Sequence, residues 1–504
     1  MVTTHGGLRE RSTAGTWLDP VVETTAGLVR GRGVGGGAVF AGIPYAAAPV
    51  GDRRLLPPAP RPGWTGVHDA RRPGPASPQP PCRLEAVVGP IRLAGQAEDC
   101  LSVNVWSPGL RERRPVLVFL HGGGYAAGSG AQDWYDGARL TDDGDIVVVT
   151  VNYRLGALGF LCPSELADDL GTGNAGLHDQ VAALRWVRDN IANFGGDPGR
   201  VTLAGQSAGA LSALAMMSSP RAEGLFHRVV LQSTPTGIAP RSPSDATDVT
   251  EQYLHLLDLK PNQIHQLRTL PVERLLDAQA ALMGTAPPLR LEPPFQLVVD
   301  GDLVAADLVG TPGWADGMDR LVGSTRDEVE GWVRACRRLA GADRAGAVGV
   351  ARDFLGDATE AEFDRIAEHA PGADPRKVLS LLATDFFFER DVPRIAAGAR
   401  RSYVYRFDWA PAGAPFGASH CLELPFVFGT LDAWREAPML AGTDPADQVA
   451  LADAMAPAWA AFARTGNPAH DGIPAWPTHQ DGGVMHFDST PSAVVVRGTP
   501  TAGR

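Results

Sequence analysis

Strand signals alternate with helix signals through the middle of this chain, and this alternation restricts the fold more than any other feature. The runs VLVFLHG (116–122) and IVVVTVNYR (146–154) are continuously apolar, which is typical of strands covered on both faces. Between residues 174 and 194 the apolar residues recur at every third or fourth position, which predicts a helix that Gly195 and Gly196 end. Strands separated by such helices predict a mostly parallel central sheet and therefore the α/β class.

Other segments extend this pattern on both sides. Further strands are expected at VTLAGQS (201–207), RVVLQS (228–233), RLVGST (320–325) and SYVYRFD (402–408). Before residue 110, the segments VVETTAGLVRG, AVFAGIP and LSVNVW are separated by turn-rich stretches, which favours antiparallel strands at the edge of the sheet. Residues 237–295 and 335–400 are mainly helical in pattern and are interpreted as cap-like insertions. Because no repeat and no clear linker is present, we predict a loose tail over residues 1–19 and one domain over residues 20–498.

The charge and the apolar runs exclude several classes of protein. The formal net charge is -12 at pH 7, and an acidic surface repels the phosphates of nucleic acids and anionic lipids. No run approaches the roughly 18 consecutive apolar residues of a membrane-spanning helix. The first nineteen residues are polar and contain no apolar core of a signal peptide. We therefore expect a cytoplasmic protein that binds neither nucleic acid nor membrane.

The cysteines give no sign of a metal site. Five are scattered without a C-x-x-C pair, namely Cys82, Cys100, Cys162, Cys336 and Cys421. This spacing argues against zinc, and the odd number fits a reducing compartment. Positive charge is carried almost entirely by Arg, and the rich use of Ala, Gly and Pro is typical of a GC-rich bacterial gene. We expect no metal and no cofactor.

The pentapeptide Gly205-Gln206-Ser207-Ala208-Gly209 is the only G-x-S-x-G in the chain. In this pattern a strand turns sharply into a helix and holds the serine at the tip, while the glycines let neighbouring segments pass close by. The context fits, because VTLA before it reads as a strand and ALSALAMM after it reads as a helix. The alternative is an inert serine in a glycine-rich turn. We predict that Ser207 is a nucleophile.

A second glycine-rich segment follows the strand VLVFL directly, namely His121-Gly122-Gly123-Gly124. Backbone N–H groups in such a loop face a ligand without obstruction, as in the loop that supplies part of an esterase oxyanion hole. The alternatives are a flexible loop and a weak phosphate-binding turn, although the Gly-Lys-Ser/Thr of a P-loop is absent. We interpret His121 as structural, because the base comes last in this arrangement.

A serine hydroxyl needs a general base, and the base needs a carboxylate that orients it. The downstream histidines are His369, His420, His470, His479 and His486. His420 is favoured because it lies in a Gly-rich loop before an apolar segment. For the acid, residues 323–328 follow a strand, and Glu328, Asp327 and Glu330 all remain candidates from position alone.

Together these segments resemble the type-B carboxylesterase/cholinesterase family of the α/β-hydrolase superfamily, from about Val21 to Phe487. The matching segments include FAGIPYAAAPVGDRR (40–54), AEDCLSVNVWSP (97–108), HGGGYAAGS (121–129), VNYRLGALGFL (151–161), GNAGLHDQ (173–180), FGGDPGRVTLAGQSAGA (194–210), LFHRVVLQS (225–233) and SHCLELPFVFG (419–429). The resemblance implies the α/β-hydrolase fold and a bacterial serine carboxylesterase without cofactor or metal. It also implies an acyl-enzyme mechanism on small to medium esters.

The resemblance also implies roles for single residues. Glu328 matches the triad acid, and His420 matches the triad base. The oxyanion donors correspond to Gly123, Gly124 and Ala208. Ser233 matches a serine that supports the acid. Two buried structural ion pairs are implied, Arg54 with Glu98 and Arg154 with Asp179.

The chain departs from the family pattern at two places. Gln206 stands where Glu is commoner, and we expect its side chain to point away from the substrate. Cys100 matches the second cysteine of a disulfide in animal members, with Cys82 as its conceivable partner. No aromatic residue lies between these cysteines, so the choline-binding tryptophan of cholinesterases has no counterpart there and choline esters are a poor substrate prediction.

Two alternatives to a simple ester hydrolase are considered. The same catalytic groups serve carbamates, amides and lactones as well as esters. A non-catalytic adhesion-type relative is disfavoured because all three triad residues are present. Phe295 and Trp332 are candidate pocket walls, and each is equally well explained as core. The expected partner is a small-molecule ester, and we expect a monomer.

Overall fold

The computed structural model of the protein describes residues 19–311 and 313–495. The strands are β1 (Val21–Thr24), β2 (Gly27–Arg30), β3 (Arg32–Val34), β4 (Gly37–Pro44), β5 (Val67–Asp69), β6 (Ser102–Ser107), β7 (Arg114–Leu120), β8 (Val147–Val151), β9 (Gly196–Gln206), β10 (Arg228–Gln232), β11 (Asp319–Thr325), β12 (Ser402–Phe407), β13 (Gly483–Phe487) and β14 (Ser492–Val495). The α-helices are α1 (Glu85–Val88), α2 (Ala138–Gly144), α3 (Gly156–Phe160), α4 (Ala175–Asn190), α5 (Ala208–Ser218), α6 (Pro243–Leu256), α7 (Val272–Gly284), α8 (Glu330–Ala335), α9 (Arg344–Leu355), α10 (Thr359–His369), α11 (Pro375–Thr384), α12 (Val392–Ala397), α13 (Leu424–Phe428) and α14 (Pro445–Thr465).

Within these residues, one large sheet has the strand order β14-β13-β12-β11-β10-β9-β7-β8-β6-β4-β3. The strands from β8 to β13 in that order pair in parallel, whereas β6, β4 and β3 at one side and β14 at the other pair antiparallel. The α/β-hydrolase fold with a mostly parallel sheet and antiparallel N-terminal strands is therefore confirmed. Because parallel strands share one carboxyl edge, residues that follow β9, β11 and β12 can meet there.

The sheet is buried on both faces, as the apolar runs predict. In β7, Val116 and Val118 pack into the cluster on one face, whereas Leu117 and Phe119 pack into the cluster on the other. A strand that alternates between two cores has no polar face. This explains why VLVFL is continuously apolar.

Two parts of the sheet differ from the sequence-based expectation. The segment VVETTAGLVRG forms the β1–β2 hairpin, but this hairpin belongs to a separate small sheet in which β2 pairs in parallel with β5. At the other end, β13 and β14 extend the large sheet through a region for which the sequence indicates no strand. β5 and β13 are short strands, and each pairs in parallel with a strand that is distant in sequence.

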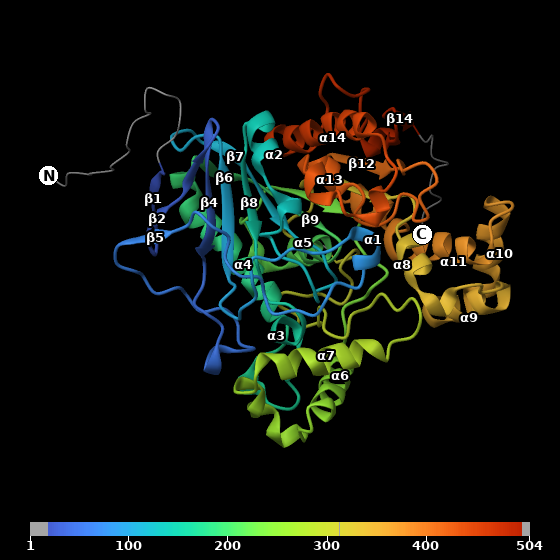
Figure 1. The fold of residues 1–504 in the computed structure, drawn as a ribbon, viewed down its shortest axis with the longest axis horizontal. Coiled ribbons are helices and arrows are strands. Elements are labelled where there is room, and N and C mark those ends of the chain that lie inside the picture. The colour runs from blue at the N-terminus through green and yellow to red at the C-terminus, as the bar shows by residue number, and fades with distance from the viewer. Residues whose placement is uncertain (1–18, 312, 496–504) are drawn as a thin grey trace.

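The two predicted insertions are helical, and the helices of the first lie at the bottom of the view in Figure 1 whereas those of the second lie at its right. Residues 237–295 contain α6 and α7, and residues 335–400 contain α9 to α12. The second insertion contributes most of a small apolar core, which also includes Val329 and Val333 from the segment that follows β11 and Ile238, Leu289 and Leu291 from the first insertion. It therefore packs directly against the start of a segment that bears a predicted catalytic residue.

Several expectations concern the ends of the chain and the cysteines. Of the tail predicted for residues 1–19, only Asp19 lies within the described residues, and the boundary at residue 498 lies outside them. No helix in the described ranges is long and apolar enough to cross a membrane. Cys82 and Cys100 are free thiols, so the conceivable disulfide is not formed.

Candidate active site

Ser207 lies at the sharp turn between β9 and α5. Its backbone has φ 56° and ψ -123°, a combination that an L-residue adopts at a cost. The flanking glycines are required by close packing: a Cβ on Gly205 would lie 2.4 Å from the carbonyl of Gly209, and one on Gly209 would lie 2.1 Å from Leu120 O. The turn therefore needs both glycines, and it directs the serine into a pocket.

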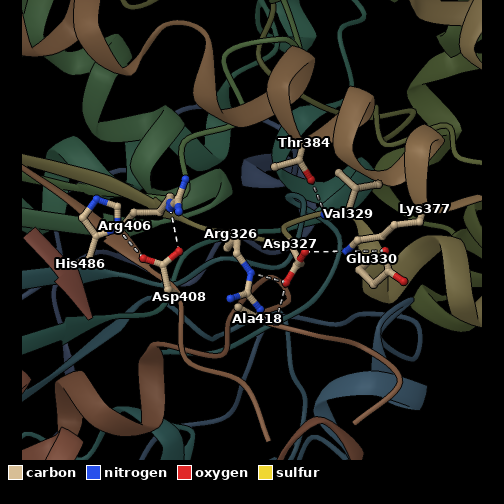
Figure 2. A network of polar contacts seen from close by, with 10 residues as sticks. All are labelled: Arg326, Asp327, Val329, Glu330, Lys377, Thr384, Arg406, Asp408, Ala418 and His486. Carbon is tan, nitrogen blue, oxygen red and sulfur yellow. Dashed lines mark hydrogen bonds and ion pairs between the residues drawn. The ribbon is translucent and has the colours of Figure 1, made fainter. Parts of the chain in front are cut away.

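Glu328 follows β11 and contacts His420 at Nδ1, the ring nitrogen that does not face Gln206. Its Oε2 lies 2.5 Å from His420 Nδ1, and its Oε1 accepts a hydrogen bond of 2.8 Å from Thr325 N. The other two candidate acids point elsewhere, because Asp327 and Glu330 both contact Lys377 (Figure 2). Of the three carboxylates, the structure brings only Glu328 to the imidazole.

His420 lies in the loop between β12 and α13, and its ring is buried. Trp332 and Phe388 pack against it at ring-centroid distances of 5.0 and 5.1 Å. Among the other histidines, His486 lies on β13 and contacts Asp408 Oδ2 at 2.6 Å (Figure 2), and His369 is exposed on α10. Only His420 therefore combines a carboxylate partner with a place beside Ser207 in the pocket.

The prediction that Gln206 points away from the substrate is wrong. Its side chain lines the pocket, with Nε2 located 3.2 Å from His420 Nε2 and 3.4 Å from Cys421 Sγ. On its other side, Oε1 lies so close to Gly122 that a Cβ there would be only 2.5 Å away. Since Nε2 of Gln206 can only donate, it satisfies the lone pair of a neutral His420 whose Nδ1–H faces Glu328.

The Gly-rich loop follows β7 and borders the same pocket. Gly123 and Gly124 have positive φ values of 111° and 60°. Within residues 19–311 and 313–495, no backbone acceptor takes the N–H of Gly123, Gly124 or Ala208. These donors, together with Ser207, line the pocket. His121 is buried, and desolvation lowers its pKa to about 4, as expected of a neutral structural histidine.

The predicted support of the acid by Ser233 is not seen as a direct contact. Ser233 Oγ is buried and has no hydrogen-bond partner in the described part of the chain, while Thr325 N binds Glu328 instead.

Sequence reasoning also missed Glu423, three residues after His420. This carboxylate is fully buried and accepts a hydrogen bond of 3.2 Å from Gln232 Nε2. Burial, and then the nearby Glu328, raise the pKa of Glu423 to about 7.

Comparisons with known proteins show the family of this chain. The family model described as "Carboxylesterase family" matches residues 18–500. The chain is 37% identical to phenmedipham hydrolase of Pseudarthrobacter oxydans over 484 residues, which cover 91% of this chain and 92% of that protein. It is 35% identical to para-nitrobenzyl esterase of Bacillus subtilis over 480 residues, which cover 92% and 93%. The structure of the carboxylesterase EST55 of Geobacillus stearothermophilus superposes with a TM-score of 0.84 at 35% identity and covers 94% and 97% of the two chains.

This chain belongs to the carboxylesterase family. It is a serine hydrolase of carboxylic esters, and its fold is that of the type-B carboxylesterases. The two ion pairs implied by this family are also present. Arg54 contacts Glu98 at 2.5 Å, and the fully buried Arg154 contacts Asp179 at 2.7 Å.

The pocket of this carboxylesterase is mainly apolar. Beside the polar groups described above, its wall contains the aliphatic side chains Leu84, Val88, Ile91, Leu211, Ile238 and Leu291. Of the two candidate wall residues, Trp332 lines the pocket. Phe295 instead packs against Tyr253 in the core, at a centroid distance of 5.1 Å. The first insertion thus reaches the pocket through Ile238 and Leu291 near its ends and through Met283 on α7.

The groups at the site suit acyl transfer by side chains and backbone alone. Within the described residues, no cluster of three or more His, Cys, Asp or Glu side chains could hold a metal ion. What the site does contain is a serine at a strained turn, an imidazole with a carboxylate behind it, and unpaired N–H groups at the start of α5 and in the Gly-rich loop.

Proposed function

We propose that Ser207, His420 and Glu328 form the catalytic triad of this carboxylesterase. The observation that carries the proposal is the short contact of 2.5 Å between Glu328 Oε2 and His420 Nδ1, beside a serine held at φ 56°. His420 removes the proton from Ser207 Oγ as the oxygen attacks the ester carbonyl carbon. Glu328 holds the imidazole in the required tautomer and stabilises its positive charge.

The first step forms the acyl-enzyme and the second destroys it. Gly123, Gly124 and Ala208 donate their N–H groups to the oxyanion, and each donor contributes about 3–4 kcal/mol to the transition state. His420 then returns its proton to the departing alcohol oxygen, and the carbonyl reforms as an ester of Ser207. Water attacks this ester by the same path, with His420 again as the base.

One motion precedes the first step. In the structure, the Nε2 lone pair of His420 faces Gln206 Nε2, whereas Ser207 Oγ makes no hydrogen bond within the described chain. A rotation about the Ser207 side chain must bring Oγ to the imidazole when substrate binds. Catalytic hydrogen bonds are often formed only in the complex with substrate.

The preferred substrates are uncharged esters with an apolar group of small to medium size. An aliphatic wall gains about 25 cal/mol for every Å² of apolar substrate surface that it buries. Carbamates are the second candidate, because a relative at 37% identity is a phenmedipham hydrolase. The same attack of Ser207 on a carbamate carbonyl gives a carbamoyl-enzyme, which water hydrolyses in turn.

The decisive experiment replaces Ser207 by Ala. The control variant replaces the exposed Ser489 by Ala. We expect Ser207→Ala to lower the kcat for a p-nitrophenyl ester by about 10^4-fold or more, and to abolish labelling by a fluorophosphonate. Ser489→Ala, which changes an exposed serine in the same way, should keep both. Retention of a few per cent of the activity in Ser207→Ala would overturn the assignment.

The remaining expectations concern the whole chain. We propose that residues 20–498 form one domain, with the two helical insertions as parts of it. The cytoplasmic location and the monomeric state stay predictions.

A further inference from the structure

The triad acid lies between two other buried carboxylates that are not part of the triad. Asp327 precedes Glu328 and Glu330 follows it by two residues, and their side chains are only 5% and 4% exposed. Three carboxylates within four residues repel one another, and removing them from water is costly unless cations pair with them. A cation that serves the two outer carboxylates would therefore control how the acid is held.

Lys377 is the side chain that contacts both outer carboxylates. From α11 in the second insertion, its Nζ lies 2.6 Å from Asp327 Oδ1 and 3.3 Å from Glu330 Oε2 (Figure 2). Of these two carboxylates, Arg326 binds Asp327 and Arg334 binds Glu330, so neither arginine joins the pair in the described part of the chain. Burial alone would raise the pKa of Asp327, but the Lys377 ammonium and Arg326 hold it below its usual value.

Asp327 also fastens the loop that contains the base. Its Oδ2 accepts a hydrogen bond of 3.0 Å from Ala418 N, and its own N–H donates to Ala418 O at 2.9 Å. The approach is so close that a Cβ on Gly417 would lie 2.6 Å from Asp327 Oδ2. One carboxylate thus joins the segment of Glu328 to the segment of His420, and His420 N–H in turn donates to Glu328 O at 3.2 Å.

Glu330 connects the same lysine to the other side of the imidazole. It is the first residue of α8, and two residues later on this helix Trp332 packs on the ring of His420. At the far end of α11, Thr384 Oγ1 accepts a hydrogen bond of 3.2 Å from Val329 N. Helix α11 therefore contacts the segment 327–332 near its first turn, through Lys377, and at its last residue, through Thr384.

We propose that Lys377 is a positioning residue for the triad: it fixes Asp327 and Glu330, and through them the relative placement of Glu328 and His420. This inference rests on the proposed function of the triad. Lys377 touches neither substrate nor the reacting atoms. A displacement of about 1 Å between acid and base is enough to lower a rate by about 100-fold, so the position of this ammonium matters for the chemistry.

The chain contains only two lysines, Lys260 and Lys377, so Lys260 is the matched control for a substitution of Lys377. Lys377→Met removes the charge and keeps the length of the side chain, Lys377→Arg keeps the charge, and Lys260→Met makes the same change at an exposed site. For each full-length variant, active sites are titrated with a fluorophosphonate, and the kcat per titrated site and the KM are measured with a p-nitrophenyl ester. We expect Lys377→Met to lower kcat per site by about 10-fold to 100-fold with KM changed less than about 3-fold. Lys377→Arg should recover most of the rate, and Lys260→Met should equal the parent.

The outcomes separate this inference from the triad assignment. If Lys377 only stabilised the fold, Lys377→Met would lower the number of titrated sites but not the kcat per site, and the proposal would be wrong. If Lys377→Met does not fold, the double variant Lys377→Met/Asp327→Asn, which buries no unpaired charge there, is measured instead. This variant should also lose kcat per site, because the ionic link to α11 is absent, and an unchanged kcat would overturn the proposal. Failure of the parent enzyme to label at Ser207 would instead refute the triad.

Discussion

The imidazole of His420 is held between a carboxylate and an amide. Glu328 Oε2 faces Nδ1 at 2.5 Å, and Gln206 Nε2 faces the other ring nitrogen at 3.2 Å. Because the carboxylate accepts the Nδ1–H and the amide donates to Nε2, the two contacts together select the tautomer that carries its proton on Nδ1. This is the tautomer that a base needs before it removes the serine proton.

Replacing Gln206 by Glu should change the pH at which the enzyme begins to work. A carboxylate at this position attracts the protonated imidazole instead of donating to the neutral one. We expect the acidic limb of the pH profile of kcat/KM to move to higher pH by about 1 unit. The matched control is Gln266→Glu, which adds the same charge at an exposed site and should leave the profile in place. A profile that does not move in Gln206→Glu would show that the amide does not govern the charge of the base.

At the scale of elements, the turn from β9 to α5 depends on two segments that nearly touch. Gly209, in the first turn of α5, passes so close to Leu120 at the end of β7 that a methyl group there would lie 2.1 Å from a carbonyl oxygen. Gly349 on α9 is the opposite case, because a Cβ there meets no atom within 4 Å. The same chemical change should therefore have opposite effects at these two places.

We expect Gly209→Ala to lower the free energy of unfolding by about 2 kcal/mol or more, since overpacking a tight contact forces the backbone to move. Gly349→Ala should raise it by about 0.5–1 kcal/mol, because alanine is the better residue in an exposed helix. Both values follow from urea denaturation monitored by circular dichroism. Equal and small effects would mean that the turn is not closely packed.

The elements that were predictable from sequence are those whose signals are local. The strands from β7 to β12 are apolar runs covered on both faces, and the residues at their carboxyl ends include Ser207. Elements that depend on distant pairing were missed or misplaced, such as β13 and the parallel partner of β2. At the site, Glu328 could not be separated from Asp327 and Glu330 by position, because a single turn of backbone decides which carboxylate faces the imidazole.

Side-chain directions at the site were harder still to predict. Gln206 was expected to point away from substrate, yet at the end of β9 it faces His420, because the loop after β12 brings the imidazole to the carboxyl end of that strand. Ser233 was expected to bind the acid, but Thr325 N occupies Glu328 Oε1. The only sequence signal for Glu423 was its spacing of three residues from His420, and that spacing does not reveal burial.

For the whole molecule, buried carboxylates give stability a dependence on pH. The pKa values of Glu423 and Glu389 are raised from 4.5 to about 7, mainly by burial. Between these two values, the folded protein keeps protons that the unfolded chain releases. The free energy of unfolding contributed by these groups is therefore fully present below about pH 4.5 and is lost as the pH rises through 7.

Glu423→Gln should remove part of this loss. We expect the parent to lose more stability than the variant between pH 5 and pH 8, with a difference on the order of 2 kcal/mol. Urea midpoints at the two pH values measure it, with Glu251→Gln on an exposed face of α6 as the control. Parallel losses in Glu423→Gln and the parent would show that Glu423 ionises normally in the folded protein.

The two helical insertions differ in how they are joined to the triad, and this sets rules for redesign. The first contributes apolar wall through Ile238, Met283 and Leu291, and Ile238 and Leu291 also share an apolar core with Val329 and Val333 in the segment of Glu328. The second supplies Lys377 and Thr384 to that segment. Engineers who exchange the first insertion between relatives to alter selectivity must therefore keep its apolar packing against Val329 and Val333. The second insertion must be exchanged together with β11 and with the loop that contains His420, because these three parts contact one another around the triad.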